Sequence, residues 1–170
     1  MEIGAGAWAG ARTVLESGAA AGPKRAFGED CVPVSYDDLE QADLIVLVGP
    51  NTAWCHPVIC QRILAAKEVR PQLRIVVVDP RRTATCEAAD LHLPIRTGSD
   101  GSLFNGLLVH LDEQDIADND FIVAHVTNAA AAVEVARVAT GDVGHAARAC
   151  GVDEALLRSS TNCSLRPVFK

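Results

Sequence analysis

The chain has 170 residues and a formal net charge of −7 at pH 7, which argues against a general affinity for nucleic acid or for an anionic membrane surface. No stretch approaches the roughly 18–20 consecutive apolar residues of a membrane-spanning helix. Apolar residues make up 49% of the chain but aromatic residues only 4%, so we expect a core of Ala, Val, Leu and Ile, as in domains with a parallel sheet. The first residues lack the basic region of a secretory signal, and we therefore expect a cytoplasmic protein.

Residues 1–22 are rich in Gly and Ala and show weak periodicity, so we expect a poorly ordered lead-in. A helical turn over residues 24–28 and a short strand over residues 31–34 follow. Ser35 and the acidic residues after it predict the start of a helix, because its N-terminus favours negative charge.

Residues 43–48 and 74–78 are short, apolar and rich in β-branched residues, which predicts two buried parallel strands. A helix over about residues 57–69 fits between them as the crossover, with Pro57 in its first turn and Pro71 after its end. The two strands and this helix are the unit around which the chain is organised.

After the second strand the pattern predicts mostly helices, separated by glycines. The expected elements are a short helix over 85–89, a strand over 91–95, and helices over about 102–111, 120–125, 129–138, 143–150 and 153–160. The sequence thus predicts an α/β fold: a Rossmann-like parallel sheet in a three-layer αβα domain over residues 23–115. Residues 116–170 are expected to form a helical C-terminal extension that is truncated.

The first strand ends in a turn that suits a phosphorylated ligand. In doubly wound sheets, ligands lie beyond the carboxyl ends of the strands. Gly49 lets the backbone approach a phosphate closely, and Asn51 and Thr52 place polar groups at the mouth of a helix, whose free N–H groups favour a diphosphate. His56 follows directly and can face the ligand. Alternatively, Gly49 serves only a tight turn.

The second strand ends in a similar turn, residues 79–83. Asp79 stands where such folds place a carboxylate that binds ribose hydroxyls or a base edge. Arg81 can neutralise phosphate charge, and Thr83 closes the turn. Gly98 and Asp100 form a third turn of this kind. Alternatively, Asp100 only caps its helix, and the arginine is only solvated.

No catalytic or metal-binding residue is predicted. The six cysteines show no Cys-x-x-Cys spacing, and we interpret them as reduced thiols that act as small apolar residues. No spacing of His with Cys or acidic residues matches a zinc site. The turns likewise lack the Gly-Lys-Ser/Thr of a P-loop and the standard NAD fingerprint.

Several segments together resemble the molybdopterin oxidoreductase family, and within it the catalytic subunits of bacterial assimilatory nitrate reductases. The matching segments are residues 24–30 (KRAFGED), 38–47 (DLEQADLIVL), 51–57 (NTAWCHP), 78–85 (VDPRRTAT) and 89–96 (ADLHLPIR). The resemblance is strong over about residues 24–111 and looser afterwards.

The resemblance implies a domain that binds one half of a pair of molybdopterin guanine dinucleotides (Mo-bis-MGD). It places Gly49, Asn51 and Thr52 against the phosphates, and it places Asp79, Arg81 and residues 98–100 toward the guanosine. In such enzymes a 4Fe-4S cluster passes electrons to the molybdenum, which reduces nitrate to nitrite by oxygen-atom transfer.

The chain also departs from the family pattern. The cysteines that bind the cluster have no counterpart, and Leu15 occupies the place of the cysteine that ligates molybdenum, counted without gaps. We therefore expect this chain to be an inactive fragment whose partners are the cofactor and the remaining domains of the parent enzyme. Exposed apolar surface that those domains normally cover would favour self-association. Two alternatives stay open: a stand-alone nucleotide-binding module, and a structural relic that binds nothing.

Overall fold

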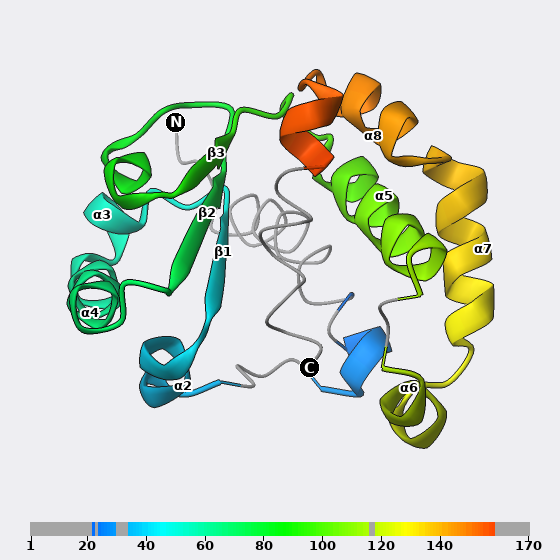
Figure 1. Ribbon diagram of the computed structural model, residues 1–170, viewed down its shortest axis with the longest axis horizontal. Coiled ribbons are helices and arrows are strands. Elements are labelled where there is room, and N and C mark those ends of the chain that lie inside the picture. Colours follow the sequence, from blue (N-terminus) through cyan, green and yellow to red (C-terminus); the bar gives the residue numbers. More distant parts are fainter. Residues whose placement is uncertain (1–21, 23, 30–33, 116–117, 159–170) are drawn as a thin grey trace, which may run out of the picture. The chain divides into compact units, whose positions relative to one another are not determined.

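A computed structural model describes residues 22, 24–29, 34–115 and 118–158 (Figure 1). Contacts within the chain divide it into two units, Met1–Ser35 and Tyr36–Lys170, each of which is described by itself. In the first unit, residues 24–27 form the predicted helical turn, and Gly28 ends it with a φ of +82°, which glycine adopts readily. The expected lead-in and the strand over residues 31–34 fall outside the described residues, apart from Gly22 and Val34.

The second unit contains a parallel sheet, as predicted. Its strands are β1 (Leu44–Val48), β2 (Arg74–Val78) and β3 (Leu91–Leu93), in the order β1-β2-β3. Both strand pairs are parallel, with Ile45 opposite Ile75 and Val77 opposite His92. The third strand is shorter than the 91–95 expected, because Pro94 has no N–H to donate and the next N–H, that of Ile95, turns back to the carbonyl of Leu93 at 3.0 Å.

Helices precede, connect and follow the strands. They are α2 (Tyr36–Gln41), α3 (Thr52–Cys55), α4 (Pro57–Val69), the 3-10 helix η1 (Ala84–Ala88), α5 (Asp100–Glu113), α6 (Asn119–His125), α7 (Ala129–Thr140) and α8 (Val143–Cys150). The sequence did not predict α3, since four residues are too few to show a period. Its first turn closes where the carbonyl of Asn51 accepts the N–H groups of Trp54 and Cys55 at 2.9 and 2.8 Å.

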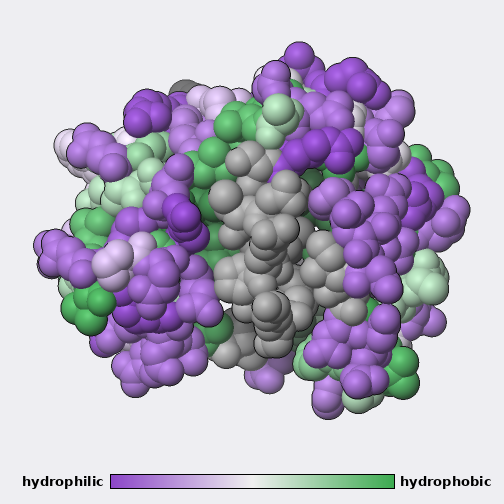
Figure 2. All heavy atoms as spheres, in the orientation of Figure 1, coloured by the Kyte–Doolittle hydropathy of each residue, from purple (hydrophilic) through white to green (hydrophobic). Residues whose placement is uncertain are grey.

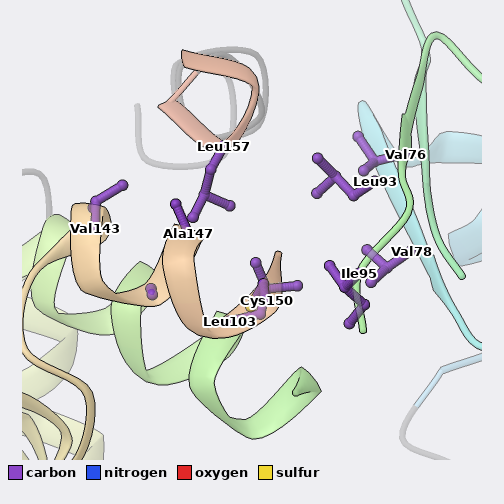
Figure 3. Packing of buried hydrophobic residues seen from close by; sticks show 10 residues of the cluster. Val76, Val78, Leu93, Ile95, Leu103, Val143, Ala147, Cys150 and Leu157 are labelled. Atoms are coloured by element: carbon purple, nitrogen blue, oxygen red, sulfur yellow. The ribbon is translucent and has the colours of Figure 1, made fainter. Parts of the chain in front are cut away.

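The two faces of β2 bury different neighbours, because successive side chains of a strand point to opposite sides. Ile75 and Val77 pack with Ile63 of α4 in one cluster. Val76 and Val78 belong to the other cluster, whose further members come from β3, α5, α8 and the segment after α8 (Figure 3). Helices therefore cover both faces of the sheet, and the predicted three-layer αβα arrangement is confirmed (Figure 1).

Helices α7 and α8 lie in the predicted C-terminal extension, and both pack on α5. Gly106 of α5 and Ala146 of α8 lie close together, since a Cβ at residue 106 would lie 2.3 Å from the Cβ of Ala146. The amide of Asn105 also donates to the hydroxyl of Thr140 at 3.2 Å. The contacts place these helices in one unit with the sheet. The domain boundaries predicted near residues 22 and 115 stay predictions.

Apolar side chains are also exposed on the second unit. On the face in Figure 2, polar residues cover much of the described surface, and apolar residues, in green, are visible among them. Val46 and Val48 on β1 are 42% and 43% exposed.

Among the described residues, no single helix has the length and apolar character to span a membrane. Only α6 and α7 taken together have both, and they are bent by 109° at the break between them.

Candidate functional site

A cavity of about 220 Å³ lies at the carboxyl edge of the sheet. Its lining comes from the ends of β1 and β2 and from the segment between β3 and α5: Val48, Gly49, Val78, Pro80, Ile95, Arg96, Thr97, Gly98 and Asp100. Three of the predicted site residues, Gly49, Gly98 and Asp100, therefore meet at one place. All three predicted turns contribute to this cavity, the second of them through Pro80.

The two glycines in the lining are needed for the shape of their turns. Gly49 and Gly98 have φ values of +66° and +80°, a left-handed conformation that strains other residues. A Cβ added at either position would meet nothing within 4 Å. Among the described residues, no side chain or backbone thus blocks the space beside either glycine, and the contact of Gly49 with a phosphate stays a prediction.

Two predicted site residues carry buried polar atoms that have no hydrogen-bond partner among the described residues. These atoms are Oδ1 of Asn51 and Oγ1 of Thr83. Asn51 and Thr83 precede α3 and η1 directly, yet neither side chain caps its helix. Because nearly all buried polar atoms in proteins are hydrogen-bonded, each such atom indicates a missing partner. Neither Asn51 nor Thr83 lines the carboxyl-edge cavity, and their contact with a ligand stays a prediction.

Asp79 is buried and holds the turn that follows β2. Its side chain is 1% exposed, and its Oδ1 accepts the backbone N–H of Arg81 at 2.7 Å. The Arg81 guanidinium lies 3.4 Å from the same oxygen, and that side chain is 70% exposed. The Asp79 carbonyl lies 2.8 Å from Nε2 of His92. Neither Asp79 nor Arg81 lines the cavity, and their contact with a ligand stays a prediction.

Thr52 and His56 are also outside the cavity lining. Thr52 begins α3 and is 4% exposed. It faces a small gap on the α4 side of the sheet, beside Ile63 and Ile75. His56 is exposed between α3 and α4, where its carbonyl accepts the N–H of Cys60 at 3.0 Å. Neither residue therefore lines the cavity with Gly49, although the sequence places Thr52 in the same turn and His56 directly after it.

Two residues that sequence reasoning left out belong to the site region. Arg96 lines the cavity, and Thr85 of η1 accepts the backbone N–H of Ala53 at 3.1 Å. Both lie in segments that resemble the family. Arg96 directly follows the strand expected over residues 91–95, so the rule that ligands bind beyond strand ends could have selected it. Thr85 lies in the expected helix over residues 85–89, to which this rule does not apply.

Two further cavities have a mainly apolar lining, to which Asp112, Asp115, Asp118 and Asn119 add polar groups in the larger one. One, of about 280 Å³, lies between the sheet and α5, and the other, of about 470 Å³, lies between α5, α6 and α7. Leu108 and Leu111 line both. Within the described ranges, no three His, Cys, Asp or Glu side chains gather in a way that could hold a metal ion. The carboxyl edge of the sheet is therefore the best candidate for ligand binding.

Comparisons with known proteins agree with the resemblance seen in the sequence. The model of the molybdopterin oxidoreductase family matches residues 11–141. A nitrate reductase of Klebsiella oxytoca is 55% identical over 105 residues, which cover 62% of this chain and 12% of that protein. A nitrate reductase of Shewanella frigidimarina is 57% identical over 109 residues, or 64% of this chain and 12% of that protein. The chain thus spans only about an eighth of the length of these relatives.

More distant relatives extend the match. An F420-dependent formate dehydrogenase subunit alpha of Methanocaldococcus jannaschii is 32% identical over 147 residues, or 86% of this chain and 21% of that protein. Acetylene hydratase from Pelobacter acetylenicus shares the fold, with a TM-score of 0.62 at 23% identity over 74% of this chain and 17% of the hydratase. Since the family model covers most of its length, this chain belongs to the molybdopterin oxidoreductase family.

Proposed function

We propose that this chain is part of a molybdenum-dependent, nitrate-reductase-like oxidoreductase and binds the guanine dinucleotide portion of its molybdopterin cofactor. The identities of 55% and 57% to nitrate reductases support the parent activity. The observation that carries the binding role is the pair of unpartnered buried oxygens, on Asn51 and Thr83, in the turns after adjacent strands. Both oxygens are shielded from solvent, so a bound nucleotide would satisfy them, directly or through water, once these turns move to admit it.

The residues fall into two groups in this proposal. Gly49 and Asn51 face the phosphates, which can approach the open backbone at Gly49 closely. Thr52, buried on the α4 side of the sheet, supports this turn at the start of α3. The guanosine is held by Asp79, Arg81, Gly98 and Asp100, with Thr83 and His56 at the edges of the site. Asp100 begins α5 and lines the cavity, so its carboxylate can accept N–H groups of a base. The bound cofactor supplies oxygen-atom transfer from nitrate, while these residues bind and orient its nucleotide.

We propose further that the chain alone does not reduce nitrate. Leu15 takes the place of the molybdenum-ligating cysteine, and the 4Fe-4S cluster and the second dinucleotide site belong to other parts of the parent enzyme. Purified chain supplied with nitrate and a reduced dye is expected to form no nitrite. Turnover above the blank would contradict this part of the proposal.

Nucleotide titration tests the binding role directly. The chain has two tryptophans, so a Trp8→Phe background leaves Trp54, which is 77% exposed on α3 beside Asn51, as the reporter. GDP is expected to change its fluorescence saturably, and more strongly than ADP or NAD. Asn51→Leu is expected to weaken the response, and so is Asp79→Asn, which keeps the size of the buried side chain.

The other outcomes of this titration are equally informative. An equal response to GDP, ADP and NAD would favour a stand-alone nucleotide-binding module. A folded sample without any saturable response would overturn the binding role and favour a relic. Far-UV circular dichroism of each variant shows whether it is folded, so a loss of structure is not read as a loss of binding.

We also propose that the remaining domains of the parent enzyme, in the cytoplasm, cover the apolar cavity between the sheet and α5. The chain spans about 12% of its nitrate reductase relatives, and Val46, which lines this cavity, is 42% exposed. The chain without those domains is then expected to self-associate. Sedimentation at increasing concentration tests this: Val46→Lys should reduce association, whereas Val138→Lys, on the exposed surface of α7, should not.

A further inference from the structure

Arg96 lies against the end of helix α8. Its backbone N–H donates to the carbonyl of Cys150, the last residue of α8, at 2.8 Å. Gly151, which follows, is so close that a Cβ there would lie 2.9 Å from Nε of Arg96 and 3.2 Å from its Cγ. With any other residue at position 151, the Arg96 side chain would have to move from its observed position.

The end of α8 favours an arginine at this point. Gly151 caps the helix in the left-handed conformation, with a φ of +72°, which is the usual role of glycine at a helix C-terminus. Unpaired carbonyl groups give a helix C-terminus partial negative charge, which attracts a guanidinium. The thiol of Cys150 also donates to the carbonyl of Ser99 at 3.4 Å. Residues 96 and 99 are thus both tied to α8.

The same segment forms part of the lining of the carboxyl-edge cavity. Arg96 is the positively charged residue among those that line it, and Asp100 is the negatively charged one. Arg81, which the sequence offers to neutralise phosphate charge, and Arg82 beside it are absent from the lining. All three arginines are exposed, so their place relative to the cavity distinguishes them. A phosphorylated ligand in this cavity therefore meets Arg96 as its nearest strong counter-charge.

We propose that Arg96, positioned by Gly151 and Cys150 of α8, binds the phosphates of a nucleoside diphosphate in the carboxyl-edge cavity. This inference rests on the proposed function, because it takes the same cavity as the nucleotide site. It adds a ligand-binding residue and makes α8, in the predicted C-terminal extension, the support of the phosphate contact.

Titration calorimetry of the full chain with GDP and with guanosine tests the role of Arg96. Arg96→Ala is expected to lower GDP affinity roughly tenfold or more, since it removes charge-assisted hydrogen bonds. Guanosine has no phosphate, so its affinity should not change. Arg82→Ala removes an exposed arginine outside the lining and should leave both affinities unchanged. Arg96→Lys should restore part of the GDP affinity, because it restores the charge without the planar fork.

A second variant tests the positioning by α8. Gly151→Ala introduces a Cβ that displaces the Arg96 side chain, so it should weaken GDP binding as Arg96→Ala does. The double variant should then bind GDP no more weakly than Arg96→Ala alone. Gly141→Ala is the matched control, because Gly141 ends α7 with a φ of +78° and its Cβ would meet His145 instead. It should strain the backbone similarly without changing GDP affinity.

Each contrary outcome has a distinct meaning. If the wild-type chain binds GDP and Arg96→Ala binds it equally well, the role of Arg96 is wrong and the proposed function stands. If guanosine and GDP affinities fall together, Arg96 supports the turn and does not bind phosphate, which also overturns the inference. If the folded wild-type chain binds neither, the proposed function fails, and the role of Arg96 fails with it.

Discussion

The hydroxyl of Thr85 accepts the backbone N–H of Ala53 at 3.1 Å. Ala53 belongs to α3, which follows β1, and Thr85 belongs to η1, which follows β2. Thr85 is only 4% exposed, so water competes little for this bond. It therefore joins the two turns that carry the unpartnered oxygens of Asn51 and Thr83.

Replacing Thr85 by valine should loosen this connection. Valine keeps the shape of threonine but leaves the Ala53 N–H without an acceptor, at a cost of about 1–3 kcal/mol. Amide hydrogen exchange at Ala53 should become faster in Thr85→Val. Thr85→Ser loses a methyl group but keeps the hydroxyl, so its Ala53 amide should stay protected. Equal protection in wild type and Thr85→Val would show that the bond does not hold α3 to η1.

Thr83→Val should stabilise the ligand-free chain and weaken nucleotide binding at the same time. The Thr83 hydroxyl oxygen is buried without a partner, and an apolar group of the same shape removes that penalty, which is about 1 kcal/mol or more. Urea unfolding measures the gain, and titration with GDP measures the loss. Thr83→Ser keeps the hydroxyl and should retain GDP affinity. A Thr83→Val chain that is less stable than wild type would contradict the prediction.

Two glycines of α5 should respond to alanine in opposite ways. A Cβ at Gly106 would lie 2.3 Å from the Cβ of Ala146 on α8, whereas a Cβ at Gly101 would meet nothing within 4 Å. Gly106→Ala should lower the free energy of unfolding by roughly 1–3 kcal/mol, because the helices must move apart. Gly101→Ala should raise it by about 0.4–1 kcal/mol, because alanine restricts the unfolded chain. Urea unfolding of both variants checks the contrast, and a stable Gly106→Ala would refute the close contact.

Asp90 should make stability depend on pH in the acidic range. Burial alone raises its pKa, but hydrogen bonds from Lys67 and from the backbone N–H of Ile75, with the charges of Lys67 and Arg74, outweigh burial and lower the pKa. The folded state thus favours the carboxylate. Its stabilising effect is fully present above the usual Asp pKa of about 3.9 and is lost as the pH falls through the lower pKa of the folded state.

Urea unfolding between about pH 6 and pH 2 measures this effect of Asp90. Asp90→Asn should flatten the acidic fall of the unfolding free energy relative to wild type, because the amide does not titrate. Glu68→Gln removes an exposed acid from α4 and should leave the acidic slope close to that of wild type. An unchanged slope in Asp90→Asn would mean that its contacts with Lys67 and Ile75 do not stabilise the fold.

The sheet and its covering helices could be predicted because their residues show a clear pattern. The β2 strand, Arg74–Val78, and the α8 helix, Val143–Cys150, have the predicted bounds. The apolar pattern did not predict features that depend on one residue or on very few residues. Pro94 ends β3 two residues early, and α3 is a single turn that only backbone hydrogen bonds reveal.

The site could be predicted only in part. The sequence near a strand end shows where the strand stops, but the direction of a side chain also depends on residues far along the chain. The turns at Gly49 and Gly98 meet in one cavity, although the strands that they follow, β1 and β3, lie on either side of β2. Thr52 follows Gly49 closely along the chain, yet α3 begins there and turns it toward the α4 side of the sheet. The Arg96 side chain lies against Gly151. The two residues are far apart along the chain, so no local sequence pattern predicts this contact.

The alternation of side chains along β2 has a consequence for how the sequence can vary among relatives. Val77 shares its packing with residues such as Ile63 and Cys86, and Val76 shares its packing with residues such as Ala146 and Ala147. Since packed neighbours must keep their combined volume, we expect substitutions to be correlated within each set and independent between the two sets. Substitutions at Val76 and at Val77, although adjacent in β2, would then be correlated with substitutions on opposite faces of the sheet.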